Sequence, residues 1–221
     1  MSSREQILAR IRTALTDVPD REQDRSGGIE RTYRTAHTPD GPALLDLLAE
    51  NLTDYRAHLH RTTDDALPAV LARLFADRGT RTLAVPAGLP SHWLAGAAGV
   101  EQLHDDGALT PRRLDTVDSV VTGCALAVAE TGTIVLDAGP AQGRRLLTLV
   151  PDHHVCVVRA DQVVASLPQA LPLLDPARPQ TWISGPSATS DIELDRVEGV
   201  HGPRTLDVVI VGPGPSDGDR S

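Results

Sequence analysis

Glu130 is the first residue whose surroundings suggest chemistry, because it separates two short apolar runs at residues 125–129 and 133–137. Such runs are typical of strands, and Gly132 permits a sharp turn between them. A carboxylate in this setting is costly unless it is exposed or paired. One interpretation is that the turn projects Glu130, with Thr131 beside it, into a cleft as a nucleophile, a general base or a hydrogen-bond anchor. The alternative is a glutamate at a hairpin tip that faces water.

The segment at residues 184–193 predicts a site for an anion. A short strand ends at residue 183, a glycine–proline pair turns the chain, and hydroxyl residues then open a short helix from about residue 187. Free backbone N–H groups and the helix dipole at such a start attract phosphate or carboxylate groups. The alternative is ordinary capping of the helix. The candidate anion-binding residues in this segment are Gly185, Ser187, Thr189 and Ser190.

Arginines and one histidine supply further candidates. Arg144 and Arg145 follow a strand and open a short helix at residues 144–149, so we expect them to face a ligand. His201 lies between two glycines, and Arg204 follows it. A histidine can act as a general acid or base near neutral pH, and an arginine can hold a carboxylate or phosphate as a planar fork. The alternative is a tight surface loop whose histidine bonds only backbone atoms.

The residue composition excludes several kinds of chemistry. Every one of the 21 basic residues is arginine, so no side chain can form a Schiff base or act as a P-loop lysine. Two cysteines, Cys124 and Cys156, cannot supply four thiolates to an iron–sulfur cluster, and we expect Cys124 to be a small buried residue. His153 and His154 precede a strand and point to opposite faces, so we expect no metal site.

Charge and hydropathy restrict the classes of partner. The 30 acidic and 21 basic residues give a net charge of −9, and no basic stripe indicates a nucleic-acid surface. The sequence contains no 18-residue apolar run, which predicts no membrane span. The first residues lack the apolar segment of a secretory signal, so we expect a cytoplasmic protein.

Helical and strand patterns alternate along most of the chain. Helices are predicted at residues 43–53, 64–77 and, interrupted by prolines, 161–174; strands are predicted at residues 57–61, 82–85, 100–103, 154–158, 181–183 and 206–211. This order predicts an α/β fold, an open mixed or parallel sheet flanked by helices. We expect three regions: an N-terminal helix (3–15) and arm at residues 1–40, which is a candidate docking element, one α/β domain at 41–211, and a disordered tail at 212–221.

Four motifs together resemble the LUD domain family, and in particular its lactate utilization protein C group. They are residues 129–136, AETGTIVL; 145–154, RLLTLVPDHH; 184–193, SGPSATSDIE; and 199–203, GVHGP. The resemblance is specific over residues 120–211 and looser over 42–119. It implies a fold like that of the NagB, RpiA and CoA-transferase superfamily. It also implies a role in oxidising L-lactate to pyruvate beside iron–sulfur partner proteins.

Two functional hypotheses follow from the residues and the resemblance. In the first, the chain is an accessory subunit without a redox centre, which binds a small anionic ligand and iron–sulfur lactate-utilization proteins. In the second, it is an acyl- or CoA-transferase-like enzyme with a CoA-like ligand, because Glu130, Thr131 and Gly132 resemble the stretch that holds the nucleophilic glutamate of class I CoA-transferases. A nucleotide-dependent ligase of similar fold is a third possibility, which the absence of lysine makes less attractive.

Overall fold

The computed structural model describes residues 2–16, 41–189, 197–198 and 202–212. The chain divides into two compact units, Met1–Arg34 and Thr35–Ser221. The first unit contributes α1 (Ser3–Ala14), which the apolar spacing predicts. Its cap is Ser2, whose hydroxyl accepts from the backbone of Glu5 while the Glu5 carboxylate accepts from the backbone of Ser2. No residue of α1 is buried, and Ile7 and Ile11 are 58% and 48% exposed.

The second unit is built on a six-stranded sheet in the order β1-β12-β7-β4-β2-β3, in which all neighbouring strands are parallel. Its central strands β7 and β12 are rich in buried valine and isoleucine, as expected of parallel strands that are covered on both faces. The predicted open α/β sheet is therefore confirmed. The six strands are β1 (His58–Thr62), β2 (Thr82–Pro86), β3 (Glu101–Asp105), β4 (Ser119–Thr122), β7 (His153–Arg159) and β12 (Thr205–Val211).

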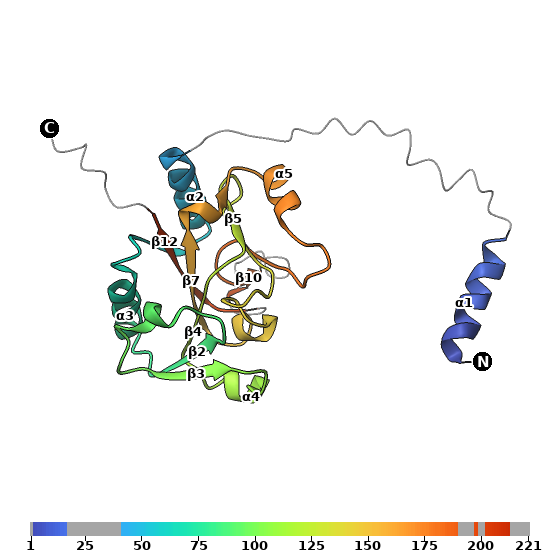
Figure 1. Ribbon diagram of the computed structural model, residues 1–221, viewed down its shortest axis with the longest axis horizontal. Coiled ribbons are helices and arrows are strands. Elements are labelled where there is room, and N and C mark those ends of the chain that lie inside the picture. Colours follow the sequence, from blue (N-terminus) through green and yellow to red (C-terminus); the bar gives the residue numbers. More distant parts are fainter. Residues whose placement is uncertain (1, 17–40, 190–196, 199–201, 213–221) are drawn as a thin grey trace. The chain divides into compact units, whose positions relative to one another are not determined.

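Helices cover both faces of this sheet (Figure 1). The apolar side of α2 (Pro42–Asp54) packs with Val208 and Ile210 of β12. The apolar side of α3 (Leu67–Asp77) packs with Val209 of the same strand, which therefore faces the other way. Shorter helical elements connect the strands: η3 (Ser91–Leu94), α4 (Pro111–Leu114), η4 (Arg145–Thr148), η5 (Ala160–Gln162), α5 (Leu167–Ala170) and η6 (Leu171–Leu173).

A separate four-stranded sheet, in the order β8-β5-β6-β9, packs beside the first. The two apolar runs around Glu130 are its antiparallel strands β5 (Leu126–Val128) and β6 (Thr133–Leu136). β9 (Thr181–Ile183) pairs antiparallel with β6, and β8 (Val163–Val164) pairs parallel with β5. The proline-interrupted helix predicted at residues 161–174 is therefore wrong in its first part, where β8 forms, whereas the short helical elements α5 and η6 occupy residues 167–173.

The helix predicted from about residue 187 is also wrong. The chain there forms β10 (Ala188–Thr189), which pairs antiparallel with β11 (Val197–Glu198). The hydroxyl residues that suggested a helix start are equally compatible with a short strand, and the pairing with β11 decides between them. The expectations for residues 17–40, for Ser190 and for His201 fall outside the described part of the chain.

Candidate functional site

A cavity of about 220 Å³ lies where the two sheets meet, at the N-terminal ends of β7 and β12. Residues of η4 form one wall, and β9 with the loop that follows it to residue 187 forms another. Residues 202–203 close a third side, and His154 and Leu206 reach the cavity from the two central strands. It therefore combines segments that are distant in the sequence, including parts of three of the four motifs that the sequence singled out.

The loop after β9 is held in place by close backbone packing. Gly185 has a φ of +80°, and a Cβ atom there would lie 2.5 Å from the carbonyl oxygen of Tyr55, at the end of α2. Only glycine fits such a position without strain. The next residues are fixed from the other side, because the N–H of Ser187 donates to the carbonyl of Pro203 at 2.8 Å. Gly185 and Ser187 therefore form a rigid part of the cavity wall.

That hydrogen bond also changes the predicted basis for anion binding. The predicted helix start would leave the N–H of Ser187 free, but this group is bonded to the carbonyl of Pro203, and β10 follows it. The helix-dipole argument for residues 187–189 is therefore wrong. Arginine side chains are the remaining predicted candidates for holding an anion.

Arg145 is the predicted arginine that lines the cavity. It begins η4, its side chain is exposed, and no carboxylate pairs with it among the residues that the structure describes. Its neighbour Arg144 instead holds Asp105 through two hydrogen bonds of 2.7 and 2.8 Å and also donates to a backbone carbonyl. Arg204 donates to Asp152 at 2.9 Å. Arg145 is thus the one of these three without an ion pair in the described chain.

The Arg144–Asp105 pair stabilises a different part of the domain. The hydrogen bond from Arg144 lowers the pKa of Asp105, against the effect of burial. The pair lies in an open, glycine-lined cleft beside the C-terminal ends of β2 and β3. Ligand binding by Arg144 stays a prediction. The contact that the structure shows for Arg144 is the ion pair with Asp105, which joins two parts of the domain.

Glu130 lies at the turn between β5 and β6, and its side chain is exposed. The Asn51 amide donates to the carbonyls of Ala129 and Glu130 at 2.8 and 3.2 Å, which holds the turn on α2. Gly132 has a φ of +56° and packs against Asn51, where a Cβ would lie 2.9 Å away. Glu130 does not line the cavity. Its predicted role as a nucleophile stays a prediction.

A chain of hydroxyl groups joins this turn to the cavity. Thr131 donates to Thr133 at 2.8 Å, and the Thr133 hydroxyl lies 2.8 Å from that of Ser184, which lines the cavity. The structure therefore places the first and second predicted motifs side by side. It does not bring the Glu130 carboxylate to the same wall as Arg145.

His154 is a residue of the site that the sequence reasoning missed. It lines the cavity although it is only 1% exposed, and its Nε2 lies 2.8 Å from the hydroxyl of Thr122. Burial, and to a smaller degree the neighbouring His153, lowers the pKa of His154 to about 3, so the ring is neutral near pH 7. The motif PDHH contained the signal, because adjacent strand residues face opposite sides of a sheet.

His153 accordingly faces the other side, where it belongs to a buried polar cluster. Its Nε2 lies 2.8 Å from Asp207, and its Nδ1 lies 2.8 Å from the hydroxyl of Ser119. His60 and Arg78 also contact the Asp207 carboxylate, at 2.7 and 3.3 Å. Burial opposes ionisation, but these hydrogen bonds and charges lower the pKa of Asp207 to about 2.

The described residues offer no group of three His, Cys, Asp or Glu side chains suited to a metal ion. Cys124 and Cys156 are both buried and unpaired as disulfides. A hydrogen bond to Cys156 and burial raise the pKa of the Cys124 thiol well above its usual range. None of the described helices is long and apolar enough to cross a membrane.

The fold and the cavity define an α/β domain with a small pocket of mixed polar and apolar lining where a second sheet meets the first. The LUD domain family matches this chain over residues 45–211, so the chain belongs to that family. A lactate utilization protein C of Deinococcus radiodurans is 45% identical over 76% of this chain and 80% of its own length. A second protein of that name, from Halalkalibacterium halodurans, is 24% identical over 93% and 99% of the two chains.

A solved structure supports the same assignment. The crystal structure of a DUF162 family protein from Deinococcus radiodurans matches with a TM-score of 0.66 and 37% identity. The match covers 79% of this chain and all of that one. The family resemblance drawn from the four sequence motifs is therefore confirmed.

Proposed function

We propose that this chain takes part in lactate utilization as a subunit that binds a small carboxylate and carries no redox centre of its own. The single observation behind the binding role is Arg145, which lines the cavity and has no carboxylate partner among the described residues. A guanidinium forms two parallel hydrogen bonds with a carboxylate, which suits this group to hold one. The names of the relatives supply the connection to lactate.

The size and lining of the cavity favour a small acid over a larger cofactor. Its volume of about 220 Å³ is below the roughly 300–1,000 Å³ typical of pockets for drug-sized ligands. Thr148 and Ser184 contribute hydroxyl groups to the wall, and Trp182 contributes apolar surface. A short acid with one or two further oxygen atoms matches this mixture better than a CoA-like molecule does.

The electron carriers of the system would be iron–sulfur partner proteins. Oxidation of lactate to pyruvate releases two electrons, which need an acceptor. This chain has two cysteines, which are too few for a cluster with four thiolate ligands. Both are buried, and the raised pKa of Cys124 keeps that thiol protonated. The proposal therefore assigns electron transfer to partners and ligand binding to this chain.

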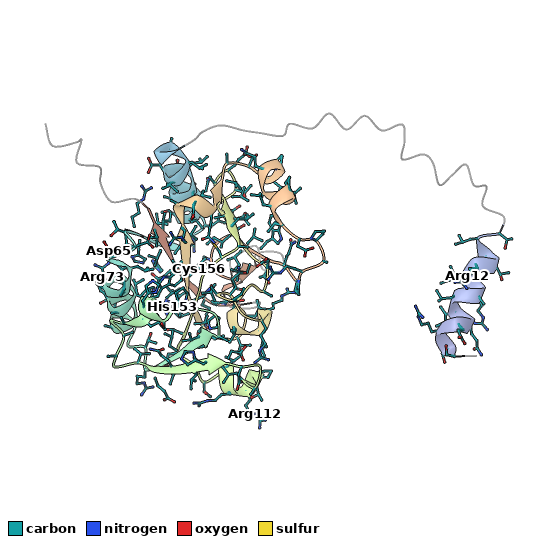
Figure 2. The ribbon with its side chains drawn as sticks, in the orientation of Figure 1. Arg12, Asp65, Arg73, Arg112, His153 and Cys156 are labelled. Carbon is teal, nitrogen blue, oxygen red and sulfur yellow. The ribbon has the colours of Figure 1, made fainter. Side chains whose placement is uncertain are left out.

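Binding of L-lactate and pyruvate to the purified protein, followed by calorimetry, tests the ligand part of the proposal. Arg145→Gln should weaken binding at least about tenfold, because a hydrogen bond to a charged group contributes about 1.5–3 kcal/mol. Arg112→Gln is the matched control, since Arg112 is an exposed arginine of α4 at the edge of the domain (Figure 2). Equal binding by both variants would refute the assignment of Arg145, and no binding of any small carboxylate to the unaltered chain would refute the site.

The accessory role has its own test. The purified chain should oxidise no L-lactate with an artificial electron acceptor, and it should co-purify with iron–sulfur proteins when they are produced together. Lactate oxidation by the chain alone would overturn the role of a subunit without redox chemistry. Deleting residues 1–40 tests whether the N-terminal region contributes to docking.

A further inference from the structure

The cavity continues past Arg145 into a second, much smaller chamber. Arg145, Thr148 and Thr181 line both spaces, so η4 and β9 form the boundary between them. The chamber has a volume of about 10 Å³, which is about the room that one water molecule or one ligand oxygen needs. The rest of its wall consists of Pro179 and of residues from the segment 136–143, which leads from β6 to η4.

Gln142 brings an unsatisfied hydrogen-bond donor to this chamber. It lines the chamber although it is only 6% exposed. Its Oε1 accepts from the backbone N–H of Asp137 at 2.5 Å, which fixes the end of the amide that carries the oxygen. Its Nε2 carries two protons and has no acceptor among the residues that the structure describes. Buried donors without an acceptor are rare in native proteins, so this one requires an explanation.

The turn that contains Gln142 holds its amide in a fixed position. The backbone N–H groups of Gln142 and Gly143 both donate to the carbonyl of Gly139 at 2.9 Å. A Cβ on Gly139 would lie 3.0 Å from Nε2 of Gln142, so the glycine leaves the amide its room. Asp137 pairs with Arg178 at 2.8 Å, which ties the start of the turn to the segment before β9. A donor that is positioned before the ligand arrives lowers the cost of binding.

We propose that Gln142 is a second ligand-binding residue, whose amide donates to one carboxylate oxygen of the ligand in the chamber. The inference rests on the proposed function, because the ligand has to be a carboxylate. The chamber has room for about one oxygen atom, so an atom inside it lies beside both Gln142 and Arg145. The two side chains then hold the same carboxylate, and the rest of the molecule extends into the cavity of about 220 Å³.

Gln142→Glu tests the assignment with almost no change in shape. The new carboxyl group keeps an oxygen for the N–H of Asp137. When it is ionised, it has no proton to donate and repels the charge of the ligand; burial favours its protonated form, which can donate as the amide does. Binding of L-lactate should therefore be at least about tenfold weaker than in the unaltered protein at about pH 8, and it should recover as the pH falls towards about 5.5.

Gln102→Glu is the matched control, because Gln102 is half-buried on β3 and lines neither space. It adds the same charge and should change the dissociation constant of lactate by less than about twofold. Titration of the unaltered protein over the same pH range cancels the effects of other groups, which near the amide are Arg145 and the Asp137–Arg178 pair. Weakening by Gln142→Glu that does not vary with pH is a structural effect and overturns the inference.

A second measurement uses the unaltered protein. The NMR signals of the Gln142 side-chain amide protons should shift when L-lactate is added. Those of Gln162 should not, because its Nε2 already donates to the carbonyl of Cys124 at 2.7 Å. If lactate binds and Arg145→Gln weakens it, but the Gln142 amide does not respond, the inference is overturned and the proposed function stands. If no small carboxylate binds, both are overturned.

Discussion

Replacing His154 with glutamine should make the protein less sensitive to acid. In the unfolded chain the imidazole has its ordinary pKa of 6.5, whereas burial lowers the pKa to about 3 in the folded chain. Between these values the unfolded state binds a proton that the folded state does not, so stability falls as the pH falls. Between pH 7 and pH 5 this single group lowers the free energy of unfolding by about 2 kcal/mol.

Urea unfolding at pH 7 and pH 5, followed by circular dichroism, measures this difference. The unaltered protein should lose about 2 kcal/mol more between the two pH values than His154→Gln does. The other seven histidines are common to both proteins, so their contributions cancel in the comparison. The reasoning about burial of a neutral ring is refuted if the two proteins lose the same free energy.

Asp207 does not interfere in this pH range. Its pKa is about 2 in the folded chain, compared with 3.8 for an unperturbed aspartate. A carboxyl group with a lowered pKa contributes stability above its unfolded pKa and loses it as the pH falls towards the folded value. The Asp207 contribution is therefore complete at pH 5 and is lost only between about pH 4 and pH 2. The two buried groups can be separated by pH alone.

Two further variants test the packing behind the site. Gly185→Ala should lower the free energy of unfolding by about 3 kcal/mol, because φ is +80° and the new Cβ meets the backbone of Tyr55. Gly99→Ala is the control, since a Cβ there meets nothing within 4 Å. Equal melting temperatures of the two variants would contradict the argument. Asp207→Asn should lower the free energy of unfolding by about 3 kcal/mol at pH 7, since it leaves two histidines and an arginine without their carboxylate. Asp46→Asn, at an exposed ion pair, should lower it by under about 1 kcal/mol. Similar denaturation midpoints for the two variants would count against a buried ionic cluster.

The sequence predicted the elements whose pattern is local. The helices α1, α2 and α3 have apolar residues at the helical period, and the strands β5, β6, β7 and β12 are short continuous apolar runs. β4 has only four residues and lies directly before another apolar segment, so no boundary marked it. β8 and β10 have two residues each, and they are strands only because β5 and β11 pair with them. No local pattern contains that pairing.

The candidate site was predictable to a similar degree. Gly185, Ser187 and Arg145 were all singled out, and the structure places all three on one cavity. Nothing local separates Arg145 from Arg144, since the difference comes from Asp105, which lies 39 residues before Arg144 on the edge strand β3. His154 was named only to dismiss a metal site. The sequence pattern shows neither the burial of His154 nor its contact with the Thr122 hydroxyl, and these two features define its environment.

The position of the cavity explains why the proposed function assigns the positive charge to a side chain. In open α/β sheets, ligands usually bind beyond the C-terminal ends of the strands, where helix N-termini offer free N–H groups to an anion. This cavity lies at the N-terminal ends of β7 and β12, and the N–H of Ser187 on its wall is already bonded to Pro203. The chain has no lysine, so in the proposed function an arginine supplies this charge. Arg145 lines the cavity, whereas its neighbour Arg144 is engaged by Asp105.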